Sequence, residues 1–187
     1  IDDGARVAIG DLRGAKEAAL ELDGTGARCM GVPLDVANES SVMEAVATVR
    51  SQMGGVDILV NNAALFSTLV NRPFEEYSGD EWMQVMSVNT LGPFLCAKAV
   101  APHMKAQRWG RIINVASTSA LKGLANMAHY VTSKGAVITF TRVLARELGA
   151  WNITANALAP GLTLSDQILK NDDHIAKFGE AIRKSRS

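Results

Sequence analysis

Two kinds of segment alternate along the whole chain, and this alternation constrains the fold more than any other feature. Short apolar or β-branched runs are typical of strands buried on both faces, as in a parallel sheet. The stretches between them have the composition of helices, with Asn38 as an N-cap and Gly149 as a C-cap. The expected strands span residues 6–10, 27–33, 56–61, 110–117 and 153–159, and the expected helices span residues 15–22, 39–53, 80–106 and 128–149.

This order of elements predicts βαβ units with right-handed crossovers. We therefore expect an α/β fold of the doubly wound, Rossmann-type class, with three layers and a mostly parallel sheet. The 187 residues contain no internal repeat and no linker-like tract, so a single domain over residues 1–187 is expected. Residues 89–93 interrupt the third helix with Gly92 and Pro93, which disfavour helix interiors by roughly 1 and 3 kcal/mol. We expect a kink there.

Composition argues against several classes of partner. Nineteen basic residues offset nineteen acidic ones, so we expect neither nucleic acid nor an anionic membrane as a partner. The apolar runs are far too short to span a bilayer. Cys29 and Cys96 fit no metal-ligand pattern, so we expect no metal and two reduced cysteines in a cytoplasmic protein.

The sharpest chemical feature is Tyr130 followed four residues later by Lys134. On a helix these positions share one face, and a nearby ammonium favours the phenolate and lowers the tyrosine pKa. Such a tyrosine can act as a general acid or base near neutral pH. Taken alone, a surface tyrosine beside a solvated lysine is the simpler interpretation, because ordinary composition gives this spacing roughly one time in twenty.

Ser117 ends the expected strand 110–117, and doubly wound folds place their sites at the carboxyl ends of strands. A hydroxyl group there can donate a hydrogen bond to a substrate carbonyl oxygen. Capping of a turn or helix explains a serine in this Ser-Thr-Ser run equally well.

Five motifs occur together, and they follow one another in the same order as in the classical short-chain dehydrogenase/reductases. The chain closely resembles this family from about residue 7 to about residue 164. The resemblance is highly specific because all five have the family's spacing. The motifs are Asn61-Asn62-Ala63-Ala64, Asn89 in the broken helix, Ser117, the pair Tyr130 and Lys134, and Pro160-Gly161.

The resemblance implies an oxidoreductase that transfers a hydride between a nicotinamide cofactor and a secondary alcohol or ketone. Tyr130 would exchange a proton with the substrate oxygen, and Ser117 would orient that oxygen. Lys134 would hold the nicotinamide ribose and lower the pKa of Tyr130. Asn89 would hold a water molecule that links Lys134 to solvent.

Asp11 closes the first strand, where a carboxylate can accept hydrogen bonds from the adenosine ribose hydroxyls and would repel a 2′-phosphate. NAD is therefore expected rather than NADP, although Arg13 is a candidate anion partner and Asp11 could instead be the N-cap or a first-turn acid of the next helix. The resemblance implies further cofactor-binding residues. At two of these positions the family more often has a different residue: Gly at position 64 and Val at position 163. These residues are Asp35, Val36, Asn61, Ala63, Ala64, Tyr130, Lys134, Pro160, Gly161 and Thr163.

The family's opening strand and its Gly-rich phosphate loop have no counterpart here, since residues 6–10 match the family's second strand. The family also continues past residue 187 into one more strand. We therefore expect a fragment, incomplete at both ends, of a functional enzyme, or else an inactive fragment. Loss of the central strand would leave two rows of unpaired backbone groups, each costing about 1–3 kcal/mol if buried.

Two other functions stay open. A 3-oxoacyl thioester reductase of the same family normally uses NADPH, which Asp11 disfavours, and a non-catalytic cofactor-binding protein would usually lack the tyrosine or the lysine.

The resemblance also implies a homotetramer formed through helices 80–106 and 128–149. No catalytic role is expected for His103, His129 or His174. The expected substrate pocket is mostly apolar, which suits an aryl or acyl ketone but also simple packing; its residues are Leu65, Phe66, Leu121, Leu124, Met127 and Leu162.

Overall fold

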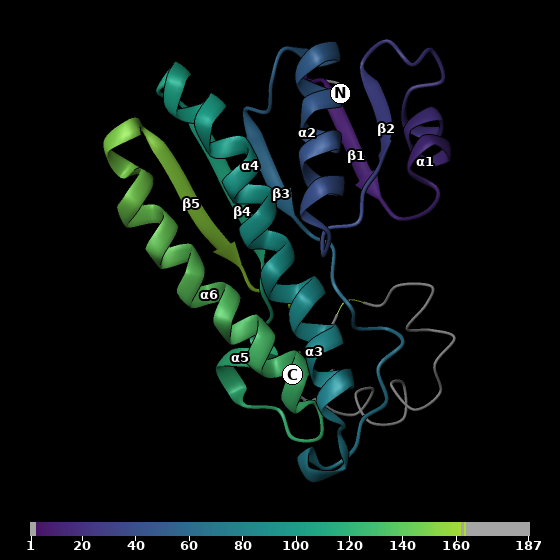
Figure 1. Cartoon of the computed structure of the whole chain (residues 1–187), viewed down its shortest axis with the longest axis vertical. Helices are drawn as coiled ribbons and strands as arrows, with labels where there is room; N and C mark the ends of the chain where they lie inside the picture. The colour runs from purple at the N-terminus through teal and green to yellow at the C-terminus, as the bar shows by residue number, and fades with distance from the viewer. Residues whose placement is uncertain (1–2, 162, 164–187) are drawn as a thin grey trace, which may run out of the picture.

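The structure, a computed structural model, describes residues 3–161 and 163. Strands and helices alternate, as the sequence predicts (Figure 1). The strands are β1 (Val7–Asp11), β2 (Cys29–Pro33), β3 (Ile58–Asn61), β4 (Gly110–Val115) and β5 (Ile153–Leu158). The helices are α1 (Ala15–Leu22), α2 (Glu39–Met53), α3 (Gly79–Met86), α4 (Gly92–Gln107), α5 (Thr118–Lys122) and α6 (Ala128–Leu148), with short turns η1 (Phe74–Glu76), η2 (Ser87–Leu91) and η3 (Gly149–Trp151).

All strand pairs are parallel, which confirms the predicted Rossmann-like class. β1 pairs with β2, and β3, β4 and β5 form a second sheet in that order. Within the described part of the chain, no strand lies between β1 and β3, so each has one edge without a partner. The sheet is thus split in two at the place where the family resemblance puts its central strand.

The helix layer holds the two sheets together. Helix α2 packs Ala45 and Val49 against Val32 of β2, and it packs Val42 against Leu95 of α4. Helices α4 and α6 continue this layer over the three-stranded sheet, and the three helices lie in front of the strands in Figure 1. A helix that contacts both halves therefore replaces the missing strand-to-strand hydrogen bonds as the link between them.

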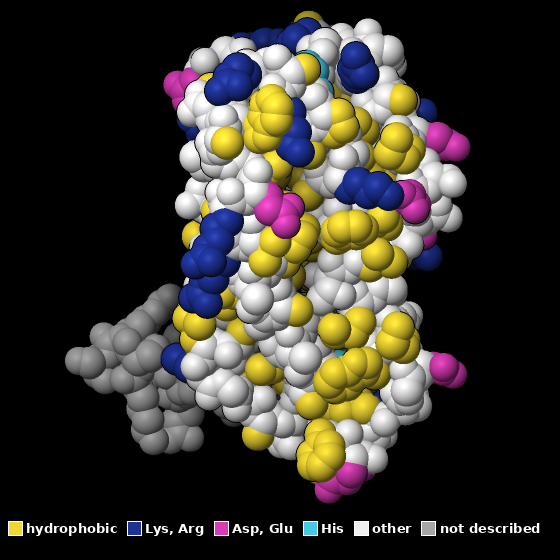
Figure 2. All heavy atoms as spheres, turned by 60° about the vertical axis from the view of Figure 1, so that its left-hand side comes forward, with side chains coloured by type: hydrophobic (Ala, Val, Ile, Leu, Met, Phe, Trp, Pro, Cys, Tyr) yellow, Lys and Arg dark blue, Asp and Glu magenta, His cyan; other side chains and the backbone are white. Residues whose placement is uncertain are grey.

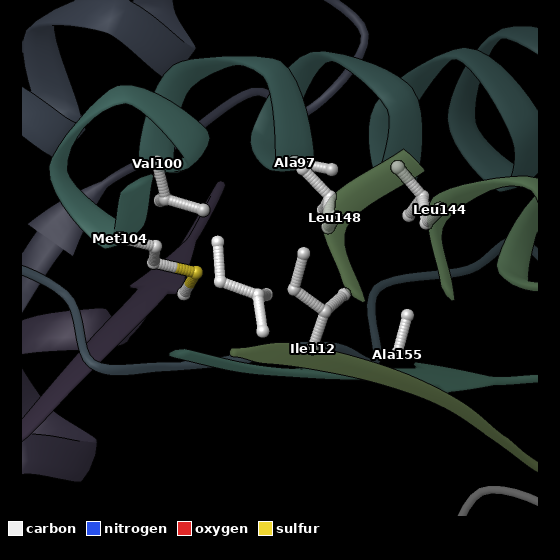
Figure 3. Packing of buried hydrophobic residues seen from close by; sticks show 8 residues of the cluster. Ala97, Val100, Met104, Ile112, Leu144, Leu148 and Ala155 are labelled. Carbon is white, nitrogen blue, oxygen red and sulfur yellow. The ribbon is translucent and has the colours of Figure 1, made fainter. Parts of the chain in front are cut away.

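The main core lies between the three-stranded sheet and helices α4 and α6 (Figure 3). Met104 of α4, Ile112 of β4 and Ile153 of β5 are at most 1% exposed. Burial of each such side chain contributes about 1.5–3 kcal/mol relative to exposure. This packing fixes β4, the strand that leads to Ser117.

The expectation that the strands are buried on both faces is wrong for β1, β3 and β5, each of which has exposed residues along its length. Ile58, Val60 and Leu158 are each more than half exposed. The physical reason for β3 and β5 is that α4 and α6, which contact their sheet, cover a single face of it (Figure 3). Only the central strand β4 alternates between buried and half-buried residues along its whole length.

Helix boundaries follow the predicted caps. Asn38 accepts a hydrogen bond from the backbone N–H of Ser41 at 3.1 Å, as the start of α2 requires. Ser78 and Glu81 form a reciprocal capping box at the start of α3. Gly149 ends α6, but it continues into the turn η3 in a right-handed conformation rather than adopting the left-handed one.

The regular helix is interrupted at the predicted place. Between α3 and α4, the segment η2 forms one turn of π-helix, and Pro93 follows as the second residue of α4. Asn89 lies in this turn and is 1% exposed. Widening of the helix at this point carries the asparagine side chain into the interior.

Candidate active site

The carboxyl ends of β3, β4 and β5 lie side by side, and Ser117 and several predicted cofactor-binding residues lie at these ends or in the loops that follow. Asn61 of β3 is in register with Asn114 of β4, and Val115 of β4 is in register with Leu158 of β5. The loops that follow stay together, because the N–H of Thr118 donates to the Pro160 carbonyl oxygen at 3.0 Å. Pro160 is thus held next to Ser117.

Ser117 and Tyr130 are in contact. The Ser117 hydroxyl group forms a hydrogen bond with the Tyr130 hydroxyl group, although the two residues come from a loop and from the first turn of α6. Ser117 is also the N-cap of α5, since its Oγ accepts hydrogen bonds from the N–H and hydroxyl groups of Ser119 at 3.2 and 2.9 Å. The capping interpretation of this serine is therefore confirmed, and its position beside Tyr130 is compatible with the catalytic one.

Lys134 lies beneath Tyr130, one turn further along α6. Its Nζ atom is 5.8 Å from the centre of the Tyr130 ring and donates to the Val115 carbonyl oxygen at 2.7 Å. The side chain is 3% exposed, and burial lowers the pKa of Lys134 to about 8. A buried lysine with a single polar partner in the described structure stands ready to bind further acceptors.

The predicted lowering of the Tyr130 pKa by Lys134 is wrong for this structure. Burial raises the pKa of Tyr130 above its ordinary value, and the hydrogen bond from Ser117 offsets part of that rise. The reason is that the Lys134 ammonium group is directed at the Val115 carbonyl oxygen rather than at the phenol oxygen. Tyr130 is therefore a protonated group, suited to donate a proton.

Asn89 uses its side chain to hold the loop that follows β3. Its Oδ1 accepts from the N–H of Leu65 at 2.8 Å, and its Nδ2 donates to the Leu65 carbonyl oxygen at 3.2 Å. Nδ2 also lies 3.1 Å from Oγ of Ser133, one residue before Lys134. Asn89 is thus linked to the helix that carries Tyr130 and Lys134.

A second set of buried polar residues was not identified from the sequence. Asn114 Oδ1 accepts from Asn61 Nδ2 at 2.8 Å, and Asn114 Nδ2 donates to Thr141 Oγ1 at 2.8 Å. These contacts tie the end of β3 to β4 and α6, directly behind the active-site edge. An asparagine inside an otherwise apolar central strand was the signal that could have revealed it.

Several predicted cofactor-binding residues share one cavity of about 560 Å³. It occupies the gap between β1 and β3, where the family resemblance puts its central strand, and it has apolar walls from α2 and α4. Residues at both ends of the two strands line it. The predicted residues that line it are Asp11, Val36, Asn61 and Ala63.

The other predicted cofactor residues lie outside this cavity's lining. Asp35 accepts a hydrogen bond from the N–H of Ala37 at 2.9 Å, and Ala64, Gly161 and Thr163 are exposed. Asp11 also shapes the turn before α1, because its Oδ1 accepts from the N–H of Arg13 at 3.0 Å. The alternative interpretation of Asp11 as an N-cap or first-turn acid of the helix is wrong, because Gly14 is the N-cap of α1 and Glu17 is the acid of its first turn. The second carboxylate oxygen of Asp11 has no hydrogen-bond partner among the described residues.

The chemistry of these groups fits a nicotinamide dinucleotide. Asp11 offers a carboxylate for ribose hydroxyl groups, and Lys134 offers a buried ammonium group beside the tyrosine. Gly92 leaves room at Val36, since a Cβ atom at position 92 would come within 2.9 Å of the Val36 side chain. Among residues 3–161 and 163, no three His, Cys, Asp or Glu side chains are grouped to hold a metal ion.

The apolar residues expected around the substrate divide into two groups. Phe66 packs on Tyr130, with ring centres 4.8 Å apart, whereas Met127 is 2% exposed and belongs to the interior. Leu121 and Leu124 are exposed near α5. Two of the named positions, Leu162 and His174, lie outside the described residues. In the described part of the chain, no helix has the length and apolar character needed to cross a membrane.

Comparison with known proteins agrees with this geometry. The 3-oxoacyl-[acyl-carrier-protein] reductase FabG of Staphylococcus epidermidis is 38% identical over 170 residues, which cover 88% of this chain and 68% of that protein. A crystal structure of NAD⁺-bound xylitol dehydrogenase superposes with a TM-score of 0.85 and 32% identity, over 91% of this chain and 66% of that one. A crystal structure of a gluconate 5-dehydrogenase from Burkholderia cenocepacia, in complex with NADP and tartrate, superposes with a TM-score of 0.83 and 32% identity. The match covers 92% of this chain and 67% of that one.

The chain spans 65% and 53% of the length of two other curated relatives that it matches. The family model described as short chain dehydrogenase matches residues 1–174, nearly the whole chain. The matched region includes the strands, the helices and every catalytic residue discussed above. On this evidence the chain belongs to the short-chain dehydrogenase family.

Proposed function

We propose that the protein carrying this chain interconverts a secondary alcohol and a ketone, with a nicotinamide cofactor as hydride donor or acceptor. The contact of Ser117 with Tyr130, above the buried ammonium group of Lys134, is the observation that carries the proposal. A hydrogen-bond donor and a proton donor that meet at one point are what reduction of a carbonyl group requires.

In the direction of reduction, the substrate carbonyl oxygen accepts a hydrogen bond from Ser117 and takes the proton of Tyr130. The bound nicotinamide supplies the hydride that reaches the carbonyl carbon. Ser117 then stabilises the phenolate left on Tyr130, which regains its proton from solvent. In this proposal Asn89 holds the water molecule that links Lys134 to solvent, and oxidation of the alcohol follows the same path in reverse.

Binding of the cofactor can be tested before any substrate is known. Titration of the purified protein with NADH, followed by fluorescence, is expected to show saturable binding that Lys134→Ala weakens, because that ammonium group is assigned to the ribose. Oxidation or reduction of the cofactor in the presence of a panel of secondary alcohols and ketones then tests the reaction. Saturable binding without turnover on any member of the panel would favour a non-catalytic cofactor-binding protein.

We propose NAD rather than NADP as the cofactor, because Asp11 presents a carboxylate at the carboxyl end of β1, where it lines the cavity. Asp11→Asn is expected to raise the affinity for NADPH relative to NADH roughly tenfold, by removing the repulsion of a 2′-phosphate. The measurement is the ratio of the two dissociation constants. Asp35→Asn is the control, because Asp35 is assigned to the adenine amino group and should weaken both cofactors equally. An unchanged ratio in Asp11→Asn would contradict the assignment.

A second candidate activity is the reduction of a 3-oxoacyl thioester. The 38% identity to FabG of Staphylococcus epidermidis supports it. The aromatic and apolar side chains near Tyr130, such as Phe66, are compatible with an acyl chain. Preference for NADPH in the experiment above would favour this candidate over an NAD-dependent dehydrogenase.

We further propose a homo-oligomer, a tetramer, formed through α4 and α6. Leu91, Phe94 and Val143 are each more than 40% exposed, and apolar side chains are prominent on the face that Figure 2 turns toward the viewer. Phe94 also packs edge-on against Phe140 of α6, so the two helices present one joint apolar surface.

Sedimentation velocity at micromolar concentration is expected to show a dimer or tetramer, and the double substitution Phe94→Asp with Val143→Asp is expected to shift it to a smaller species. Charges placed in an apolar interface are costly because they lose their hydration. Phe74→Asp is the matched control, since Phe74 is 75% exposed in η1, away from these helices. A wild-type protein that sediments as a monomer would contradict the proposal.

The cytoplasm is the proposed location. Cys29 and Cys96 are both buried free thiols in the described structure. Burial raises the pKa of Cys96 to about 11, which keeps it as an unreactive thiol. Reduced cysteines of this kind are ordinary in a reducing compartment.

A further inference from the structure

The loop of residues 62–77, between β3 and α3, is held near the catalytic tyrosine at its first end. Asn89 binds both the N–H and the carbonyl oxygen of Leu65, as described above. The next residue, Phe66, lies against the ring of Tyr130. The first part of the loop therefore forms a wall beside the reacting hydroxyl group.

The second end of the loop is held by Tyr77. Its hydroxyl oxygen lies 2.9 Å from the Asn126 carbonyl oxygen and 3.0 Å from the Val70 carbonyl oxygen, and it accepts from the N–H of Arg72 at 3.3 Å. Asn126 belongs to the segment before α6 and has a positive φ of 64°, and its carbonyl oxygen also accepts from the N–H of Arg72 at 3.1 Å. One phenol group thus connects two segments that are about fifty residues apart in the sequence.

The ring of Tyr77 also reaches the helix that carries Tyr130. It packs on His129, with ring centres 4.1 Å apart, and the Arg72 guanidinium group lies over its other side and pairs with Glu81. His129 is 3% exposed, and its Nδ1 atom accepts a hydrogen bond from the N–H of Tyr130 at 2.9 Å. An unbroken series of contacts therefore runs from Tyr77 to the backbone of the catalytic tyrosine.

We propose that Tyr77 is a positioning residue for the reaction, because its hydroxyl group ties the loop 62–77 to the segment before α6 and so holds Phe66 against Tyr130. This inference rests on the function proposed above. Tyr77 does not touch the reacting atoms; it sets the wall against which the substrate is oriented. Loss of that constraint should affect how the substrate binds more than how the proton is transferred.

Tyr77→Phe tests this inference because it removes the hydroxyl group and keeps the ring stacked on His129. The KM for the ketone or alcohol found in the panel is expected to rise about tenfold, the equivalent of one or two lost hydrogen bonds. The kcat should change less than about twofold. The dissociation constant for NADH should stay the same, because Ala63 and Ala64, the cofactor residues of this loop, precede Leu65, which Asn89 still holds in the variant.

A second measurement does not depend on activity. Hydrogen exchange followed by mass spectrometry should show faster exchange in peptides covering residues 64–72 of Tyr77→Phe, because the amide of Arg72 loses one partner and the loop loses its tie. Ser51→Ala is the matched control: it removes a hydroxyl group that bonds to the Thr48 carbonyl oxygen on α2, far along the chain from this loop. That control should leave both KM and the exchange of residues 64–72 unchanged.

The outcomes separate the inference from the proposed function. A lowered melting temperature with unchanged KM would show that Tyr77 only stabilises the fold, and it would overturn the inference. Unchanged exchange in residues 64–72 would overturn it as well. If the wild-type protein turned over no substrate, the proposed function would fail, and faster exchange in Tyr77→Phe would then show the tie but no role in a reaction.

Discussion

Tyr130→Phe is expected to reduce turnover roughly 10²–10⁴-fold, the usual contribution of a general acid or base. The substitution removes the hydroxyl group that would exchange a proton with the substrate and keeps the ring, so packing against Phe66 is preserved. The loss should appear in kcat. The dissociation constant for NADH and the midpoint of unfolding should stay close to those of the wild-type protein.

The pH dependence gives a sharper test of the same residue. Burial raises the pKa of Tyr130, with Ser117 offsetting part of the rise, so the group is protonated at neutral pH. Reduction of a ketone needs this protonated form and should proceed at neutral pH, falling only as pH rises through the raised pKa. Oxidation of the alcohol needs the phenolate, so its rate should increase about tenfold per pH unit below that pKa.

Ser117→Ala serves as the comparison for Tyr130→Phe. It should lower turnover and leave cofactor affinity intact, because Ser117 is assigned to the substrate oxygen alone. It should also raise the Tyr130 pKa further, since the hydrogen bond that favours the phenolate is lost. If Tyr130→Phe kept near-wild-type turnover across the whole pH range, the catalytic role of this tyrosine would be wrong.

The elements of the fold were predictable because their signals are local. The limits of α1 and α2 agree with the sequence prediction to the residue. An Ala-rich stretch sets the limits of α1, and Asn38 and Gly54 cap the two ends of α2. The break at Asn89 was predictable for the same reason, because Gly92 and Pro93 disfavour a regular helix wherever they occur.

Burial was less predictable because it depends on what covers a strand. Apolar residues on β3, such as Ile58 and Val60, have the pattern of a strand buried on both faces, yet both are more than half exposed. The sequence of β3 is suited to a sheet that is covered on both faces. In the described structure, the helices that contact β3 cover one face of the sheet. Strand composition indicates the environment a strand fits, not whether that environment is present.

In the candidate site, too, some features were predictable from the sequence and others depended on contacts between distant residues. Ser117, Tyr130 and Lys134 were named because five motifs together resemble the family, and the structure brings these three side chains close together. The contacts of Asn114 with Asn61 and Thr141 were not predicted, because they join residues 53 and 27 positions apart. The direction of the Tyr130 pKa was also missed, because it depends on where the Lys134 ammonium group points and not on its spacing.

Lys134 connects this chemistry to stability. Its folded-state pKa of about 8 lies below the ordinary value of 10.5, so the folded chain binds fewer protons than the unfolded chain between those pH values. Stability therefore rises with pH from about 8 to about 10.5, and below pH 8 the cost of burying the charge is fully present. At neutral pH that cost is about 3 kcal/mol. The buried ammonium group is thus retained at the expense of stability, as groups at functional sites often are.

Lys134→Met is therefore expected to make the protein more stable and inactive at once. Methionine fills a similar volume without a charge, so the unfolding free energy at pH 7 should rise by about 2 kcal/mol after loss of the hydrogen bond to Val115. The increase should disappear as pH approaches 10.5, because the wild-type lysine is then neutral in both states. Turnover should fall at least 10²-fold, and NADH should bind more weakly, because the ammonium group is assigned to the ribose and to the path by which Tyr130 regains its proton from solvent.

Urea denaturation at pH 7 and pH 10, together with kcat and the NADH dissociation constant, measures all three effects. Lys98→Met is the matched control, because Lys98 is more than half exposed and paired only with an exposed Glu39. That change should alter stability by less than about 0.5 kcal/mol at either pH and leave turnover intact. A purely structural lysine would give the opposite pattern in Lys134→Met, with lower stability and an unchanged rate per folded molecule. That result would remove Lys134 from the proposed mechanism.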